Sequence, residues 1–216
     1  MMSSASPRAD DTAEPRTSRK RRAILGAAST VFLRNGYVGT SMDEIAALAA
    51  VSKQTVYKHF ADKERLFAEL VVTTVREASD PVHDEVLDLT YSGKVEADLR
   101  DLARRQLAKV MQPQVLQLRR LVIGEASRFP ELGRTFYELG PERTIAALAT
   151  VFAQLAERGV LRLDDPSLAA EHFNWLVMAT PLNRAMLLGE DEPPAADLVR
   201  YADAGVRAFL AAYGRP

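Results

Sequence analysis

Hydrophobic residues recur along this chain at the spacing of an α-helix. The clearest case lies between residues 17 and 35, where four apolar residues fall at positions i, i+4, i+7 and i+8 and so share one face. They are Ile24, Ala28, Val31 and Phe32. No segment alternates between apolar and polar residues and is bounded by hairpin turns, as strands are. The pattern therefore predicts an all-α fold.

Capping signals predict where these helices begin and end. Asn35-Gly36 ends the first helix, because both residue types tolerate the left-handed conformation. Ser41 and Glu44 form a capping box that opens a short second helix, and Ser52 opens a third that reaches about Phe60. Further caps and first-turn prolines predict helices over 62–78, 94–111, 113–128, 141–157, 165–188 and 194–213, or about nine helices in all.

The second and third predicted helices are short and are joined by a turn at residues 50–52, which makes a helix-turn-helix. On a helical wheel, one side of the third helix is polar and the other is apolar. The polar side holds Lys53, Gln54, Tyr57 and Lys58, and the apolar side holds Val56 and Phe60. Amine, amide and phenol groups suit base edges and phosphates. The pattern alone fits a DNA-reading helix and a solvated helix of a bundle equally well.

Composition narrows the class of protein. The chain has 216 residues, 47% of them hydrophobic, so it can form one large or two small domains. It has no cysteine, which excludes disulfides, thiolate metal sites and a cysteine nucleophile. The net charge is −1, yet residues 1–60 hold nine Lys and Arg against five Asp and Glu. A basic N-terminal part indicates that this end meets a polyanion, with a solvated tail as the alternative.

The composition of the N-terminus and the length of the apolar runs bear on where in the cell the protein is located. Residues 1–15 are rich in Ser, Ala, Pro and Asp and are expected to be a disordered tail. Residues 19–22, Arg-Lys-Arg-Arg, would form either an arm along phosphates or part of a soluble tail. No apolar run is long enough to span a membrane, and the N-terminus lacks the apolar core of a signal peptide. We therefore expect a cytoplasmic protein without membrane contact, associated with the nucleoid when bound to DNA.

The chain offers little for catalysis. Histidine lies beside a carboxylate at residues 83–85 and at Glu171-His172, and the latter two side chains point apart on a helix. No G-x-S-x-G or H-E-x-x-H motif and no Gly-rich phosphate loop occurs. We expect no catalytic residues, no metal and no cofactor, and so no enzyme.

Residues 24–67 read ILGAASTVFLRNGYVGTSMDEIAALAAVSKQTVYKHFADKERLF. This stretch resembles the DNA-binding domain of the TetR/AcrR family of bacterial transcription regulators. The matching elements are Ala-Ala before Phe32, Gly36-Tyr37, Thr40-Ser41, Ile45-Ala46, Val51-Ser52-Lys53, Tyr57-Lys58-His59-Phe60, Lys63-Glu64 and Leu66. Ala50 departs from the family, which usually has Gly there, at a small cost if the position needs a positive φ.

The resemblance implies a set of DNA contacts. Thr40 and Lys63 would contact phosphate, Lys53, Gln54 and Thr55 would face bases, and Tyr57 and His59 would meet backbone or bases. Together with Ser41, Ser52 and Lys58, these residues form the predicted DNA-binding set. The alternatives are that Thr40 only caps a helix, that Gln54 points to water and that His59 is a packed ring.

The rest of the chain would form the second domain. The division expected is a tail over 1–15, the DNA-binding domain over 16–66 and a helical effector-binding and dimerisation domain over 67–216. Within it, LVIGEASRFPELGRTFYELGPERTIAALATVFAQLAERGVL and PLNRAMLLG resemble the AefR-like C-terminal subgroup. The resemblance implies a dimer interface of four helices, two from each chain.

Two residue sets carry these expectations, and core packing is the alternative for every member. The candidate pocket comprises Met111, Leu118, Val122, Phe129, Phe136, Phe152, Phe173, Asn174, Trp175 and Met178, a largely apolar set that favours an apolar effector. The candidate dimer interface comprises Ala169, Leu176, Thr180, Leu198, Ala202, Gly205 and Phe209. Gly205 is costly inside a helix and would allow close approach of a partner helix.

The sequence thus predicts a ligand-responsive regulator of transcription. It would be a repressor that binds a palindromic operator as a homodimer and is released by a small, mostly apolar effector. The alternative is a helical small-molecule carrier or enzyme with a vestigial helix-turn-helix.

Overall fold

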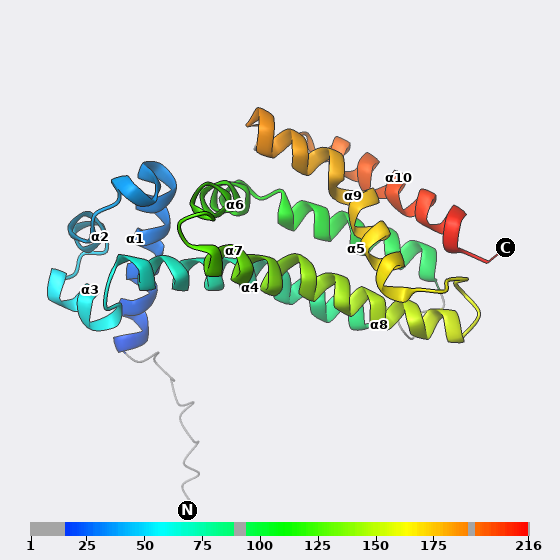
Figure 1. Cartoon of the computed structure of the whole chain (residues 1–216), viewed down its shortest axis with the longest axis horizontal. Coiled ribbons are helices and arrows are strands. Elements are labelled where there is room, and N and C mark those ends of the chain that lie inside the picture. Colours follow the sequence, from blue (N-terminus) through cyan, green and yellow to red (C-terminus); the bar gives the residue numbers. More distant parts are fainter. Residues whose placement is uncertain (1–15, 89–93, 190–192, 216) are drawn as a thin grey trace, which may run out of the picture. The chain divides into compact units, whose positions relative to one another are not determined.

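The computed structural model describes residues 16–88, 94–189 and 193–215 (Figure 1). Helices dominate this part of the chain, and no strand occurs in it beyond an isolated bridge between Leu161 and Gly214. The predicted all-α fold is therefore confirmed, while the predicted tail over 1–15 lies outside the described residues. The chain divides into two compact units, 1–66 and 67–216, with the boundary inside one helix.

The N-terminal unit holds three helices and the start of a fourth. These are α1 (Arg16–Gly39), α2 (Met42–Leu48), α3 (Lys53–His59) and the first turn of α4 (Lys63–Asp88). Gly36 has φ 71°, so it interrupts α1 near its end as the Asn35-Gly36 pair predicts. The unit has its own core, in which Ile24, Ala28, Val31, Phe32, Ile45 and Val56 are completely buried.

Two serine caps fix the helix-turn-helix. The Ser41 Oγ accepts a hydrogen bond from the Glu44 backbone N–H at 3.1 Å, and the Ser52 Oγ accepts one from the Thr55 backbone N–H at 3.1 Å. Between the two helices, Ala50 adopts φ 52°, the one positive φ outside glycine in the described chain. The turn therefore requires the conformation that glycine adopts more easily.

The C-terminal unit contains the remaining helices. They are the rest of α4, α5 (Val95–Val110), α6 (Pro113–Glu125), α7 (Pro130–Tyr137), the π-helical turn η2 (Glu138–Glu142), α8 (Arg143–Glu157), α9 (Pro166–Leu188) and α10 (Ala195–Tyr213). Three predictions need correction here. The pattern missed α7, and Pro141 lies inside η2, which links α7 to α8, instead of opening a helix. In addition, α4 continues through Pro81 beyond its predicted end at residue 78.

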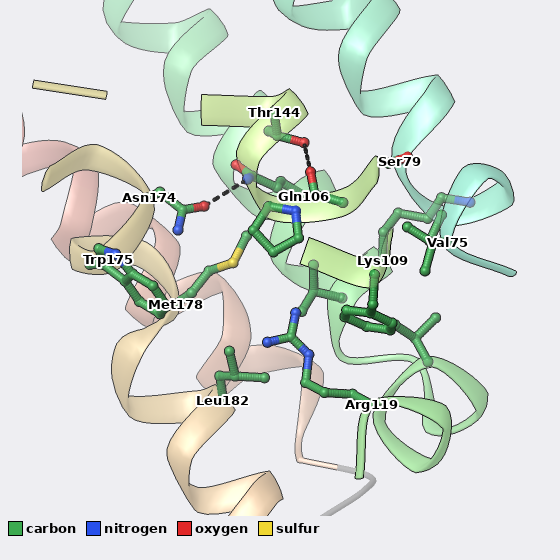
Figure 2. Close-up of a pocket in the computed structure, with 16 residues that line it drawn as sticks. Val75, Ser79, Gln106, Lys109, Arg119, Thr144, Asn174, Trp175, Met178 and Leu182 are labelled. Atoms are coloured by element: carbon green, nitrogen blue, oxygen red, sulfur yellow. Dashed lines mark hydrogen bonds between the residues drawn. The ribbon is translucent and has the colours of Figure 1, made fainter. Parts of the chain in front are cut away.

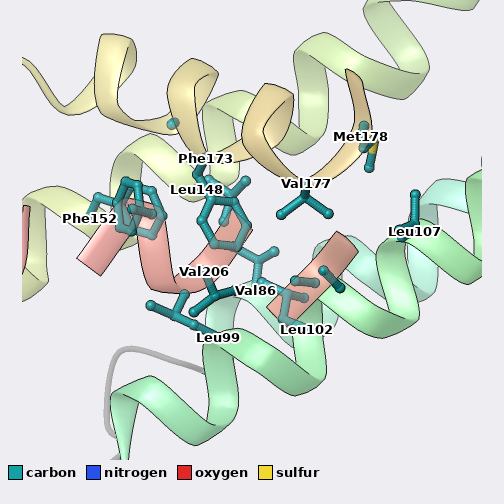
Figure 3. Packing of buried hydrophobic residues seen from close by; sticks show 14 of the residues in the cluster. Val86, Leu99, Leu102, Leu107, Leu148, Phe152, Phe173, Val177, Met178 and Val206 are labelled. Atoms are coloured by element: carbon teal, nitrogen blue, oxygen red, sulfur yellow. The ribbon is translucent and has the colours of Figure 1, made fainter. Parts of the chain in front are cut away.

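Three aromatic rings join the helices of this unit. Phe152 of α8, Phe173 of α9 and Phe209 of α10 are completely buried, and their ring centroids lie 4.9–5.7 Å apart. Such stacked and edge-on pairs stabilise a core beyond the area they bury. Figure 3 shows Phe152 and Phe173 with Val206 and Leu99 in the surrounding apolar cluster.

Helices α9 and α10 run side by side and pack closely (Figure 1). A Cβ atom on Gly205 would lie 2.9 Å from the backbone C and O of Leu176, so the glycine permits an approach within one chain. Its partner helix is therefore α9 of the same chain, which corrects the expectation of a second copy at this point. Ala169, Ala202 and Phe209 are likewise completely buried within the chain and have no surface to offer a partner.

An ion pair ties α5 to α10. The Arg104 guanidinium donates two hydrogen bonds of 2.8 Å to the Asp203 carboxylate. These bonds hold the pKa of Asp203 below its usual value and raise that of Arg104. None of the helices described is both long and apolar enough to cross a membrane.

Candidate nucleic-acid interface and ligand pocket

The N-terminal unit presents the polar side of α3 to solvent. Lys53, Gln54 and Lys58 are exposed, and Tyr57 is 43% exposed despite its large ring. On the other side, Val56 is completely buried. The structure thus places the sequence-predicted polar face where a duplex could reach it.

One of these cations already has a partner. The Lys53 ammonium lies 2.8 Å from the Asp43 carboxylate of α2, and the hydrogen bond and charge of that carboxylate raise the pKa of Lys53. Both side chains are largely exposed, so the pair can exchange its partner for a phosphate or a base at small cost. Asp43 was absent from the predicted set, although its place in the first turn of α2 faces the start of α3.

The side chains of two predicted phosphate contacts bond backbone carbonyls of the protein itself. The Thr40 side chain is buried, and its hydroxyl donates to the Gly36 carbonyl at 2.7 Å. The Lys63 ammonium donates to the carbonyls of Tyr37 (2.9 Å), Thr40 (3.0 Å) and Val38 (3.4 Å), which occupies its three hydrogens. Both side chains therefore hold the loop after α1, and their contact with phosphate stays a prediction.

The remaining members of the predicted set lie at the edge of the α3 face. Ser41 and Ser52 are exposed caps, and the Thr55 hydroxyl shares a 2.8 Å hydrogen bond with Ser52. His59 is half-buried, with its ring centroid 6.3 Å from that of Phe60, which supports the packed-ring alternative for this residue. Residues 19–22 belong to α1, so they form part of a helix and not an extended arm.

A cavity of about 70 Å³ lies inside the C-terminal unit (Figure 2). Residues of α4 to α9 line it: Val75, Ala78, Ser79, Gln106, Lys109, Val110, Val115, Arg119, Phe136, Gly140, Pro141, Thr144, Asn174, Trp175, Met178 and Leu182. Four predicted pocket residues are among them, namely Phe136, Asn174, Trp175 and Met178. The other six, Met111, Leu118, Val122, Phe129, Phe152 and Phe173, do not line this cavity, and Phe152 and Phe173 belong to the aromatic core.

Apart from Asn174, the polar lining of the cavity was missed by sequence reasoning. The buried Gln106 amide donates to the Asn174 side-chain oxygen at 3.2 Å, which joins residues 68 positions apart. Arg119 extends its guanidinium over the Phe136 ring, 5.2 Å from the centroid. Neither contact has a local sequence signal, since each arises only when two different helices pack together, α5 with α9 and α6 with α7.

Several apolar side chains are exposed along α9. We call this set the α9 face, and it consists of Leu168, Trp175, Leu176, Leu187 and Leu188, all more than 40% exposed. Of the predicted interface residues, Leu176 belongs to it, Thr180 is exposed on the same helix, and Leu198 of α10 is half-buried. No cluster of three or more His, Asp or Glu side chains suited to a metal gathers in the residues described.

Two family models match this chain. Residues 24–70 match the model described as bacterial regulatory proteins, tetR family. Residues 97–215 match the model described as AefR-like transcriptional repressor, C-terminal domain. Together the two models cover the helix-turn-helix and most of the C-terminal unit, while the cavity-lining residues Val75, Ala78 and Ser79 of α4 lie between the two matches.

Solved structures and relatives agree with these models. A protein from Mesorhizobium loti, described as a TetR-family transcriptional regulator, is 46% identical and superimposes with a TM-score of 0.87, over 94% of this chain and all of its own. The flavonoid-responsive regulator FrrA is 34% identical with a TM-score of 0.70, over 91% of this chain and 98% of its own. The transcriptional regulator AcrR of Shigella flexneri is 34% identical over 49% of this chain, and the match covers 46% of AcrR.

Proposed function

Because this chain belongs to the TetR family, it is a DNA-binding transcriptional regulator and not an enzyme, and we propose that it acts as a repressor. In this proposal it binds a palindromic operator as a homodimer and leaves the operator when a small, mostly apolar effector binds. The observation that carries the proposal is the solvent-exposed polar face of α3, rigidly held by the caps of α2 and α3.

The α3 face has the chemistry for reading DNA. Gln54 can bond an adenine edge, Lys53 can bond guanine once it releases Asp43, and Tyr57 and Lys58 can bond phosphates. Thr40 and Lys63, which would contact phosphate by resemblance, also keep the loop before α2 in place. Recognition therefore depends on exposed residues of α3, and positioning depends on buried ones around it.

A dimer follows from the palindrome and from the α9 face. Two half-sites in successive major grooves lie about 34–36 Å apart and require a two-fold symmetric protein. The α9 face is a run of exposed apolar side chains on one helix, and such a surface on a water-exposed protein marks an interaction site. We propose that this face meets its copy in the partner subunit.

The cavity of the C-terminal unit would receive the effector. Its lining is mostly apolar, and at about 70 Å³ it is smaller than the 300–1,000 Å³ typical of ligand sites. An effector must therefore enlarge it, and binding would favour a conformation with the lining displaced. Val75, Ala78 and Ser79 place α4 in this lining, and the same helix begins at Lys63 next to the helix-turn-helix. FrrA is by its name responsive to flavonoids, which supports a small organic effector here.

Selection of bound sequences from random DNA by the purified protein tests the proposal. We expect a two-fold symmetric site, and Lys53→Ala or Gln54→Ala should each relax preference at one base pair per half-site by about 1–3 kcal/mol. Ser18→Ala, an exposed change on α1, is the matched control and should leave the preference unchanged. Binding that shows no sequence preference, or a Gln54→Ala variant with unaltered preference, would contradict the assignment of α3.

A further inference from the structure

The lining of the cavity is unbalanced in charge. It contains two cationic side chains, Lys109 and Arg119, and no carboxylate. Its other polar side chains are Ser79, Gln106, Thr144 and Asn174, all neutral. Ten further residues complete an apolar wall. A site of this kind disfavours cationic ligands and favours apolar molecules that carry negative charge.

Most of the neutral polar groups are satisfied within the chain. The Ser79 hydroxyl donates to the Leu139 carbonyl at 3.1 Å, and the Thr144 hydroxyl donates to the Gly140 carbonyl at 3.2 Å. The Gln106 amide nitrogen uses Asn174, as described above. Two buried atoms of the lining remain without a hydrogen-bond partner in the structure, the Gln106 Oε1 and the Arg119 Nε.

Arg119 is the unusual member. Its guanidinium extends from α6 into the cavity between Met178, Leu182 and Lys109 (Figure 2). Within the described part of the chain no carboxylate forms an ion pair with it, and its recorded neighbour is the face of the Phe136 ring. Burial lowers the pKa of Arg119 with no acidic group to oppose the effect. A cation removed from water without a counter-charge is costly to fold, so its environment is suited to a partner that arrives from outside.

We propose that the effector is an apolar molecule with one carboxylate, and that Arg119 pairs with this carboxylate inside the cavity. The planar guanidinium matches two carboxylate oxygens, and the apolar body of the effector would contact Val75, Met178 and Leu182. A hydroxyl on the same molecule can donate to the Gln106 Oε1. This inference rests on the proposed effector site and adds the chemical class of the ligand.

A matched pair of dyes tests the charge requirement without DNA. 1-Anilinonaphthalene-8-sulfonate and N-phenyl-1-naphthylamine share the same rings and differ by one sulfonate, and both fluoresce more strongly in apolar surroundings. The full chain should bind the sulfonate at least about tenfold more tightly than the neutral amine. Arg119→Leu should abolish this preference by weakening only the sulfonate, and Arg119→Lys should keep part of it. Arg134→Leu on α7 removes an exposed arginine paired with Glu131 and should leave the preference intact.

Competition in the unaltered protein tests whether a carboxylate supplies the required charge. 2-Naphthoate should displace the sulfonate dye, and 2-naphthamide, of the same size and without charge, should need at least about tenfold more. This arm remains informative if circular dichroism shows that Arg119→Leu does not fold. Equal affinity for the two dyes, binding of neither, a preference that survives Arg119→Leu in a folded variant, or equal competition by acid and amide would overturn the proposal. Operator binding is measured separately, so failure here leaves the DNA-binding role standing, and loss of operator binding leaves this result readable.

Discussion

Lys63 is a charged residue whose ammonium bonds the protein's own backbone beside the helix-turn-helix. Its ammonium closes three carbonyls that follow α1 and lies 4.7 Å from the centre of the Tyr37 ring. The residue therefore acts on the position of α2, and through α2 on α3.

We predict that Lys63→Met lowers the free energy of unfolding by about 1–3 kcal/mol, because it leaves three carbonyls without their charged donor. Operator affinity should fall, while the dependence of affinity on salt concentration should keep its slope. Lys58→Met is the control: it should leave stability unchanged and flatten the slope by about one unit, since Lys58 is free to reach a phosphate. Urea denaturation and binding titrations across salt concentrations measure both quantities. A flattened slope with full stability in Lys63→Met would restore it as a phosphate contact.

The structural roles of single residues differed in how far the sequence could predict them. Ser41, Gly36 and Ala50 act through neighbours within a few positions, so the caps and the positive φ at residue 50 could be anticipated. Lys63 bonds residues 23–26 positions away, and Gln106 bonds a residue 68 positions away. Such contacts depend on how helices cross, which local patterns do not encode.

At the scale of elements, α9 and α10 approach each other through a glycine. Gly205 lies where any side chain would meet the Leu176 backbone, which cannot move aside as a flexible side chain could. The sequence indicated that the glycine matters for close packing, against either a partner subunit or the chain's own core, and the geometry at Gly205 supports the second alternative. A small residue on a helix face indicates close packing, and it does not indicate whose helix packs there.

We predict that Gly205→Ala destabilises the C-terminal unit by roughly 1–3 kcal/mol, because the added methyl group forces α9 and α10 apart. Gly124→Ala in α6 is the matched control, since nothing lies within 4 Å of the added atom and alanine favours a helix by up to about 1 kcal/mol. Thermal and urea unfolding compare the two variants. Equal stability of Gly205→Ala and the parent would mean that the helices can separate at no cost.

The helices themselves were largely predictable, and their exceptions have physical reasons. Long amphipathic segments such as α8 and α10 carry a strong period, and α10 also starts where Pro194 predicts. Helix α7 has only eight residues, too few for a clear period, although Pro130 at its start was an available signal. The cavity was only partly predictable because apolar residues that line it and those that fill the core look alike in sequence.

At the scale of the whole molecule, the α9 face exposes apolar side chains that a partner subunit would cover in the proposed dimer. Trp175 and Leu176 are 46% and 45% exposed there, and Trp175 also lines the cavity. A dimer through this face would bring an effector and a partner subunit to the two sides of one ring. That arrangement gives a direct route by which ligand binding could alter the geometry of the dimer.

We predict that Leu176→Arg gives a folded monomer with greatly weakened operator binding, since a charge at the centre of an apolar interface must lose its water without a partner. Ile123→Arg on α6 introduces the same charge at a residue that is 61% exposed and lies outside the α9 face, and it should remain dimeric. Sedimentation with circular dichroism decides the outcome. A Leu176→Arg variant that is still a dimer would place the interface on another surface.

The length of α3 limits how many base pairs one DNA-binding unit can contact. Seven residues span about 10 Å at 1.5 Å each, or about three base pairs at 3.4 Å each. In the proposed dimer, two DNA-binding units would contact about six base pairs directly, and a six-base-pair sequence recurs by chance roughly once in 4,000 positions, against the 10⁶–10⁹ competing sites of a genome. The spacing between the two half-sites must supply the rest of the information. Rigidity of the proposed dimer would therefore contribute to its specificity. A dimer whose half-site spacing varied would bind additional sites in the genome before it lost affinity for its own operator.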